Sequence, residues 1–169
     1  PRPGIDGRGY APAWEWRGGA RRDAMPEEAV DVFRRNLRAT AGVGAAFGAR
    51  TLFVAQTARL RAGREEEDRV YLESWTPGLT WRGYLDGVRR YNDAARALAG
   101  EGVAAFVDPF AAGAFGDADF QDPVHFSAAG SEKFARSLAG EVARLRAGGA
   151  GAPLAKMPAG SAVPASGTR

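Results

Sequence analysis

The chain of 169 residues contains no cysteine and only one histidine, His125. Without cysteine it can form neither a disulfide nor a thiolate metal site, and a single histidine cannot build a typical zinc site. We therefore expect no metal centre and no cofactor. Because histidine alone has an unperturbed pKa near neutral pH, any acid–base chemistry is concentrated at His125.

Long apolar runs are also absent. No stretch of about 18 apolar residues exists, which excludes a transmembrane helix. Residues 1–20 hold glycine, proline, tryptophan and charges instead of an apolar segment, so no signal peptide is visible. The chain starts with Pro1 and not with methionine, which we interpret as processing, trimming or origin from a longer protein.

Lysine is nearly absent, since only Lys133 and Lys156 occur and the other basic residues are arginines. These arginines are interleaved with acidic residues, and the net charge is only +3. A phosphate-binding surface needs basic residues clustered on one face, so we expect no nucleic-acid partner. A composition of 45% hydrophobic and 25% charged residues is typical of a soluble globular protein, here of one domain.

Hydrophobic periodicity divides the chain into elements. Apolar residues recur every three or four positions in three segments, which predicts helices over residues 26–47, 81–99 and 127–145. Short apolar runs at 51–55 and 103–107 predict buried strands. The remaining segments are an irregular start (1–25), a charged connection with room for part of a helix (57–77), a loop (109–126) and a disordered Gly/Ala/Pro/Ser tail (148–169).

The order helix–strand–helix–strand–loop–helix predicts an α/β layered fold with a parallel sheet. Functional groups of such sheets gather at the carboxyl ends of the strands. The 109–126 loop leaves the second strand at such an end, which makes it the candidate site.

Within that loop, Asp122 lies three residues before His125 and is followed by Pro123. A tight turn there brings the carboxylate to the ring, where it would accept the Nδ1 proton and leave Nε2 for a nucleophile. Asp108, at the end of the second strand, is a rival with less suitable spacing. The alternative is structural: Asp122 caps a turn, and His125 packs beneath the last helix.

The block Asp122-Pro123-Val124-His125-Phe126-Ser127, with Gly130 and an amphipathic helix after it, resembles the last conserved block of the SGNH (GDSL-type) hydrolases. Segments 33–56 and 91–108 are similar to the preceding helices and strands of that family, so the likeness covers about residues 27–147. It implies a three-layer α/β/α fold with a parallel sheet, SGNH- or flavodoxin-like, whose N-terminal strands are missing. It also implies that His125 and Asp122 are catalytic.

Two features of that family are missing from the sequence. The chain has no Gly-Asp-Ser block for the nucleophile and no Gly-x-Asn-Asp block for the oxyanion hole. Asn92-Asp93 lacks the preceding glycine and lies within a predicted helix. Ser74 falls in a charged segment, and Ser127 is better used as a helix cap, while Ser131 and Ser137 belong to the last helix. We therefore expect that this chain is the C-terminal part of a hydrolase and that it has no esterase activity by itself.

The predicted substrate is a small-molecule or glycan ester, cleaved by the serine route. Two alternatives remain open: an acyltransferase that moves acyl groups onto a glycan, and a degenerate domain kept for binding. Trp14, Trp16, Trp75 and Trp81 either line an acyl or sugar pocket or, as we favour, cover the core. The acidic run of residues 65–68 is interpreted as a solvated face. The sequence predicts neither oligomeric state nor compartment.

Overall fold

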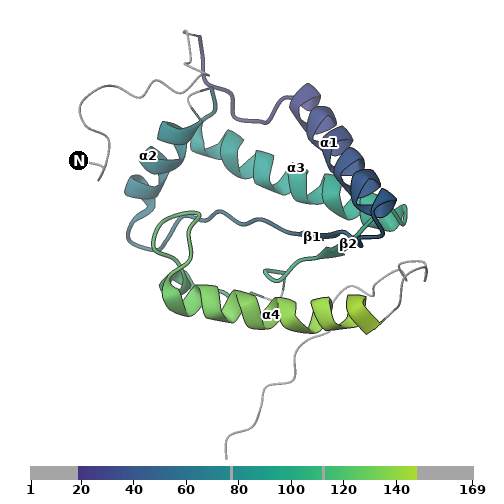
Figure 1. Cartoon of the computed structure of the whole chain (residues 1–169). Coiled ribbons are helices and arrows are strands. Elements are labelled where there is room, and N and C mark those ends of the chain that lie inside the picture. Colours follow the sequence, from purple (N-terminus) through teal and green to yellow (C-terminus); the bar gives the residue numbers. More distant parts are fainter. Residues whose placement is uncertain (1–18, 77, 112, 148–169) are drawn as a thin grey trace, which may run out of the picture.

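The computed structural model describes residues 19–76, 78–111 and 113–147. Within these ranges the chain alternates helices with two short strands (Figure 1). The elements, in chain order, are α1 (Glu27–Ala46), β1 (Leu52–Val54), α2 (Glu65–Trp75), α3 (Trp81–Gly100), β2 (Ala105–Val107), the one-turn 3₁₀ helix η1 (Asp117–Asp119) and α4 (Ala128–Ala147). The three predicted helices are confirmed, and the charged connection contains α2. The predicted tail and most of the irregular start lie outside the described residues.

Local chemistry explains where the long helices begin and end. The Pro26 carbonyl accepts the first hydrogen bonds of α1, and Gly48 ends that helix with φ 71°, a left-handed conformation suited to glycine. The Ser127 hydroxyl accepts a hydrogen bond from the Gly130 amide at 3.1 Å, so Ser127 caps α4 as predicted.

The two strands pair in parallel, with Leu52 opposite Ala105 and Val54 opposite Val107. Both are shorter than the sequence predicts. The Val103 amide donates to the Leu98 carbonyl at 3.0 Å, so this residue closes α3 and does not extend β2. The fold is therefore a mixed helix-and-strand structure around a two-stranded parallel sheet.

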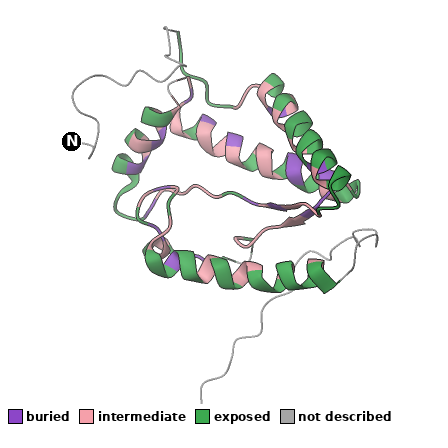
Figure 2. Ribbon diagram, in the orientation of Figure 1, coloured by how far each residue is buried: buried purple, intermediate pink, exposed green. Residues whose placement is uncertain are grey.

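One side of the sheet carries the hydrophobic core. Helices α1 and α3 cover this side, and α4 lies on the other (Figure 1). Leu98 is 0% exposed and Ala104 is 1% exposed. They form one cluster with three further buried residues, Ala41, Phe53 and Ala95. Figure 2 shows buried positions on α3, on the strands and on the inner face of α1.

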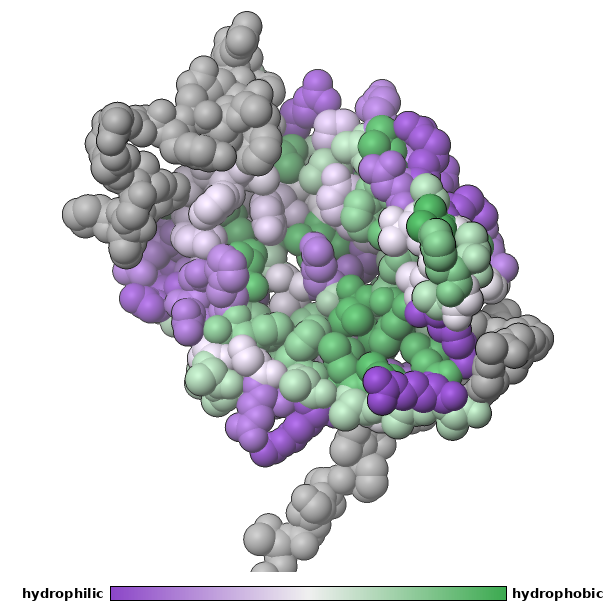
Figure 3. Space-filling view, in the orientation of Figure 1, coloured by the Kyte–Doolittle hydropathy of each residue, from purple (hydrophilic) through white to green (hydrophobic). Residues whose placement is uncertain are grey.

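The α4 side is more open. Among its 20 residues only Gly130 is buried, and Phe134 and Leu138 are half-buried. A helix of this length spans about 30 Å, whereas strands of three residues span about 10 Å, so much of α4 has no sheet beneath it. Hydrophobic side chains are visible in the space between the sheet and α4 (Figure 3). Val142, an apolar residue in the periodic pattern of this helix, is 39% exposed for the same reason.

No helix in the described ranges has both the length and the apolar character needed to cross a membrane.

Candidate active site

The candidate site is the tip of a loop that follows β2. The chain reverses there: Phe120 and Phe126 form an antiparallel bridge, the Gln121 amide donates to the His125 carbonyl at 2.9 Å, and the Ser127 amide donates to the Asp119 carbonyl at 2.8 Å. These bonds close a narrow hairpin whose tip is Asp122-Pro123-Val124. The loop therefore has a defined conformation.

At this tip Asp122 and His125 contact each other directly. Nδ1 of His125 lies 2.8 Å from Oδ2 of Asp122. The other carboxylate oxygen, Oδ1, accepts the backbone N–H groups of Val124 at 2.9 Å and His125 at 2.8 Å. Both carboxylate oxygens are thus occupied, and the ring is held through one nitrogen. The predicted approach of the carboxylate to the ring is confirmed.

The environment keeps Asp122 ionised. Partial burial acts to raise the pKa of Asp122, but hydrogen bonds from the Val124 amide and from the side chain and amide of His125 act more strongly in the other direction. The pKa of Asp122 therefore lies below its ordinary value. A carboxylate in this state accepts a hydrogen bond from the N–H group of Nδ1 and stabilises a protonated ring.

The His125 ring is accessible on its other side. Its side chain is 64% exposed, against 26% for Asp122. The Tyr71 hydroxyl lies 3.4 Å from Nδ1, the nitrogen already bound by Asp122. Nε2 makes no hydrogen bond with any residue of the described ranges. The structural alternative holds in part: Asp122 caps the turn by accepting the Val124 and His125 amides, but the exposed His125 ring does not pack beneath the last helix.

Arg59, in the segment after β1, fixes the loop from behind. Its amide donates to the Pro123 carbonyl at 3.0 Å, and Pro123 is fully buried. Its guanidinium donates to the Phe115 carbonyl at 2.8 Å and pairs with Asp117 at 2.5 Å. This one residue therefore holds both the tip and the base of the loop.

Arg61 adds a second, buried support. Its guanidinium donates to the Gln121 carbonyl, directly before Asp122, and forms an ion pair with Asp68 at 2.5 Å. Arg61 is 7% exposed and Asp68 is 1% exposed. Burial acts to raise the pKa of Asp68, yet hydrogen bonds and charge from Arg61 hold that pKa below its usual value. Through this pair, α2 supports the loop that carries the dyad.

The prediction of a solvated acidic face is wrong for Asp68. Residues 65–67 are exposed, but Asp68 points inward because Arg61 supplies the opposite charge and three hydrogen bonds. The sequence shows an arginine and an aspartate seven residues apart, and nothing local indicates that they pair.

Gly130 has a steric role in the site. A Cβ atom at this position would lie 2.0 Å from the Asp119 carbonyl oxygen, which is backbone and cannot move aside easily. The first turn of α4 therefore packs directly against the end of η1, three residues before Asp122. This contact explains why a glycine follows His125 at this spacing.

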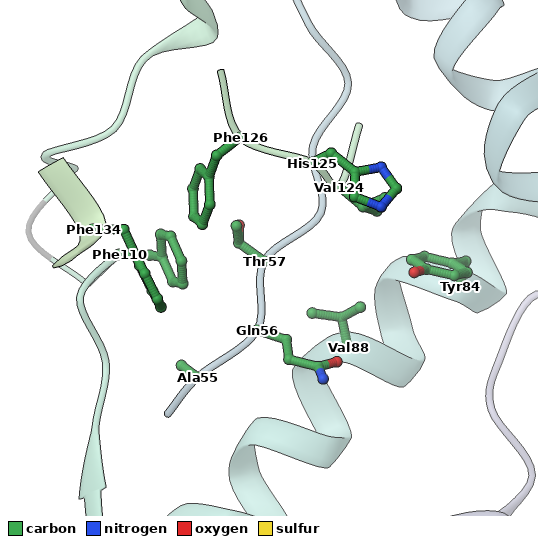
Figure 4. Close-up of a pocket in the computed structure, with 10 residues that line it drawn as sticks. All are labelled: Ala55, Gln56, Thr57, Tyr84, Val88, Phe110, Val124, His125, Phe126 and Phe134. Carbon is green, nitrogen blue, oxygen red and sulfur yellow. The ribbon is translucent and has the colours of Figure 1, made fainter. Parts of the chain in front are cut away.

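A pocket of about 310 Å³ opens beside the dyad. Its lining comes from the end of β1, from α3, from the loop and from α4 (Figure 4). Three phenylalanines, Phe110, Phe126 and Phe134, lie on one side of the view, and His125 and Tyr84 lie on the other. Tyr84 is one of the apolar and aromatic positions whose periodicity predicts the helix over residues 81–99, but periodicity does not distinguish a pocket wall from a core position.

The other residues considered from the sequence do not join the site. The Asn92 side chain accepts from the Gln56 amide and donates to the Gln56 carbonyl, so it ties α3 to the end of β1. Asp108 binds Arg96 and the Phe110 amide. Neither group contacts His125.

Three of the four serine hydroxyls considered from the sequence have other partners. Ser74 donates to the Tyr71 carbonyl, Ser127 to the Ala118 carbonyl, and Ser137 to the Phe134 carbonyl. Trp75 is 52% exposed and does not cover the core as we favoured, whereas the Trp81 ring contacts the guanidinium groups of Arg69 and Arg82. The other tryptophans, Trp14 and Trp16, lie outside the described residues.

The site therefore combines an exposed histidine ring, a carboxylate in contact with that ring and an adjacent small pocket. Among the described residues, no three His, Asp or Glu side chains gather in a way that could hold a metal ion. No family model, no curated protein and no solved structure matches this chain.

Proposed function

We propose that this chain is the C-terminal part of a serine-type ester hydrolase, and that it supplies the proton-transfer half of the active site. The observation that carries the proposal is the 2.8 Å contact between Nδ1 of His125 and a carboxylate whose second oxygen is fixed by two backbone amides. This arrangement sets the tautomer of the ring, because a proton on Nδ1 leaves the lone pair on Nε2.

In this proposal, Nε2 removes the proton of a serine hydroxyl as its oxygen attacks the ester carbonyl carbon. The resulting tetrahedral intermediate collapses, and the protonated ring gives that proton to the departing alcohol. A water molecule then repeats the sequence on the acyl-enzyme and releases the acid. Asp122 remains ionised throughout and stabilises the protonated ring. The serine, and the oxyanion donors that the resemblance assigns to the Gly-x-Asn-Asp block, come from a part of the protein outside this chain.

The α/β/α fold with further strands, which the resemblance implies, belongs to the same proposal. Two features support it. The backbone groups of Thr51 and Ala55 form hydrogen bonds with β2. Because the backbone N–H and C=O groups of successive residues in a strand point in opposite directions, those of Leu52 and Val54 point away from β2. They face an edge with no other strand in the described ranges. A two-stranded sheet is also only marginally stable without further strands. The apolar residues Phe134 and Leu138 of α4 are only half-buried.

The decisive experiment compares this chain with the longer protein encoded by its reading frame. The 169-residue chain should show no turnover of an alkyl ester; an unactivated ester is needed because imidazole attacks activated esters without a site. The longer protein should hydrolyse the ester, and His125→Ala should lower its kcat by about 10³-fold or more. Arg136→Ala, at an exposed position of α4, is the matched control.

Three results would contradict the proposal. These are His125-dependent turnover by the 169-residue chain, turnover by the longer protein that His125→Ala does not change, and an upstream coding sequence without a Gly-Asp-Ser block. The last result would favour the degenerate binding domain. Sugar hydroxyls that compete with water for the acyl group would identify the acyltransferase instead.

A further inference from the structure

Tyr84 is one of three polar residues in the lining of the pocket, with Gln56 and Thr57, that the proposed mechanism does not use. It lies in the first turn of α3 and lines the same pocket as His125. Its hydroxyl makes no hydrogen bond with any residue of the described ranges, although its side chain is half-buried. In Figure 4 the hydroxyl oxygen is directed towards the side of the pocket where Gln56 and Val88 lie.

The hydroxyl is not among the buried unpaired atoms of the described residues, so it faces solvent, and a ligand that enters the pocket displaces the water there. A ligand with an acceptor oxygen would replace the hydrogen bond to that water. Burial, together with the nearby charge of Asp122, raises the pKa of Tyr84, so the phenol stays protonated and remains a donor. Tyr84 can thus donate a hydrogen bond to a neutral oxygen while it keeps its proton.

The rest of the pocket restricts the size and polarity of that ligand. Its volume of about 310 Å³ is at the lower end of the range for small-molecule sites. The rings of Phe126 and Phe134 are tilted against each other with centroids 5.0 Å apart, and Phe110 stacks on each at about 6 Å, so one wall is aromatic and apolar. A short hydrocarbon chain fits this wall, while a charged group would lose its hydration there.

We propose that Tyr84 is a substrate-binding residue whose hydroxyl donates a hydrogen bond to the carbonyl oxygen of a small ester, with the acyl chain against Phe110, Phe126 and Phe134. This inference rests on the proposed ester hydrolase and names its substrate class as esters of short acyl chains. It assigns to Tyr84 a contact that the Asp122–His125 pair cannot supply, because neither group donates to the carbonyl oxygen.

The test uses binding, so that it does not depend on turnover. Methyl butyrate is titrated into the 169-residue chain, and the ring signals of the single histidine are followed by NMR. The wild-type chain should show a saturable shift. Tyr84→Phe should keep the fold, since no protein hydrogen bond is lost, and should weaken binding about 3- to 10-fold, the effect of one neutral hydrogen bond.

Two controls separate the hydroxyl from general effects. Tyr91→Phe is the matched protein variant, because Tyr91 lies on the same helix and stacks on Phe33 away from this pocket. Methyl butyl ether is the matched ligand, because it has the same skeleton without the carbonyl oxygen. Tyr91→Phe should leave methyl butyrate binding unchanged, and Tyr84→Phe should leave ether binding unchanged.

The inference is overturned if methyl butyrate produces no saturable shift, if Tyr84→Phe leaves its affinity unchanged, or if the variant weakens ester and ether equally. Each of these results leaves the ester hydrolase open if the longer protein still shows His125-dependent hydrolysis. Loss of that hydrolysis, with ester binding intact, would overturn the proposed function while leaving Tyr84 as a binding residue.

Discussion

The two sides of the sheet are stabilised in different ways. On the α1–α3 side, apolar side chains pack to near-complete burial around Leu98. On the α4 side, the helix buries only Gly130, and the loop is held mainly by hydrogen bonds to its own carbonyls, from Arg59 and Arg61, and by stacked phenylalanines. The first side provides stability, and the second positions an exposed histidine. Substitutions on each side can break or sharpen this contrast.

The largest effect is expected from breaking the buried pair on the site side. Arg61→Met leaves Asp68 buried without its counter-charge, which should cost about 3–5 kcal/mol in the free energy of unfolding. The double variant Arg61→Met/Asp68→Leu removes both charges and should recover most of that loss, yet it still lacks the bond to the Gln121 carbonyl. Urea unfolding measures the stability, and the ring signals of His125 measure the geometry.

The same pair predicts a pH dependence. The pKa of Asp68 is lowered in the folded state, so its contribution is present above the unfolded pKa of about 4 and is lost as pH falls below it. The double variant should lack this part of the acid destabilisation. Equal acid sensitivity in the wild type and the double variant would show that the pair does not contribute.

The next effect tests the apolar side. Leu98→Ala removes a side chain with 0% exposure and should cost about 2–5 kcal/mol. Leu138→Ala, the same change on half-buried α4, should cost clearly less because water already reaches that surface. Equal losses in chemical denaturation would show that α4 is packed as tightly as α3 and would remove the contrast.

A smaller effect with opposite signs is expected for two glycines of α4. Gly130→Ala places a Cβ atom against the Asp119 carbonyl oxygen and should cost about 1–3 kcal/mol, with a shift of the His125 signals. Gly140→Ala meets nothing within 4 Å and should stabilise the chain by about 0.5–1 kcal/mol. Thermal unfolding of both variants provides the comparison. Stabilisation by Gly130→Ala would disprove the close contact.

The smallest change in stability is expected for Asp122→Asn, about 1 kcal/mol at neutral pH. Because the pKa of Asp122 is lowered in the fold, the difference from the wild type should shrink as pH falls below about 4. Its main effect should be on the tautomer of neutral His125: ¹⁵N shifts should show the proton on Nδ1 in the wild type and a move towards Nε2 in the variant. Identical shifts would mean that Asp122 does not orient the ring.

Sequence reasoning predicted the elements and the dyad because both depend on local patterns. These patterns involve residues that are close together in the sequence: the helical periodicity, the Ser127 cap and the three-residue spacing of Asp122 and His125. The residues that it missed depend on distant partners. Asp68 is buried only because Arg61 faces it, Val142 is exposed because the strands beneath α4 are short, and Tyr84 lines a pocket because of how the loop lies over α3.

The register of the sheet has a consequence for folding kinetics. Leu52 pairs with Ala105, and the whole of α2 and α3 lies between them in the chain. The chain therefore loses the conformational entropy of a long loop before the first hydrogen bond of the sheet can form. The helices depend on local contacts and can form on the microsecond scale, ahead of the sheet. Since the loop with His125 leaves β2 directly, we expect the dyad to assemble among the last parts of the molecule, and a destabilised sheet to delay it further.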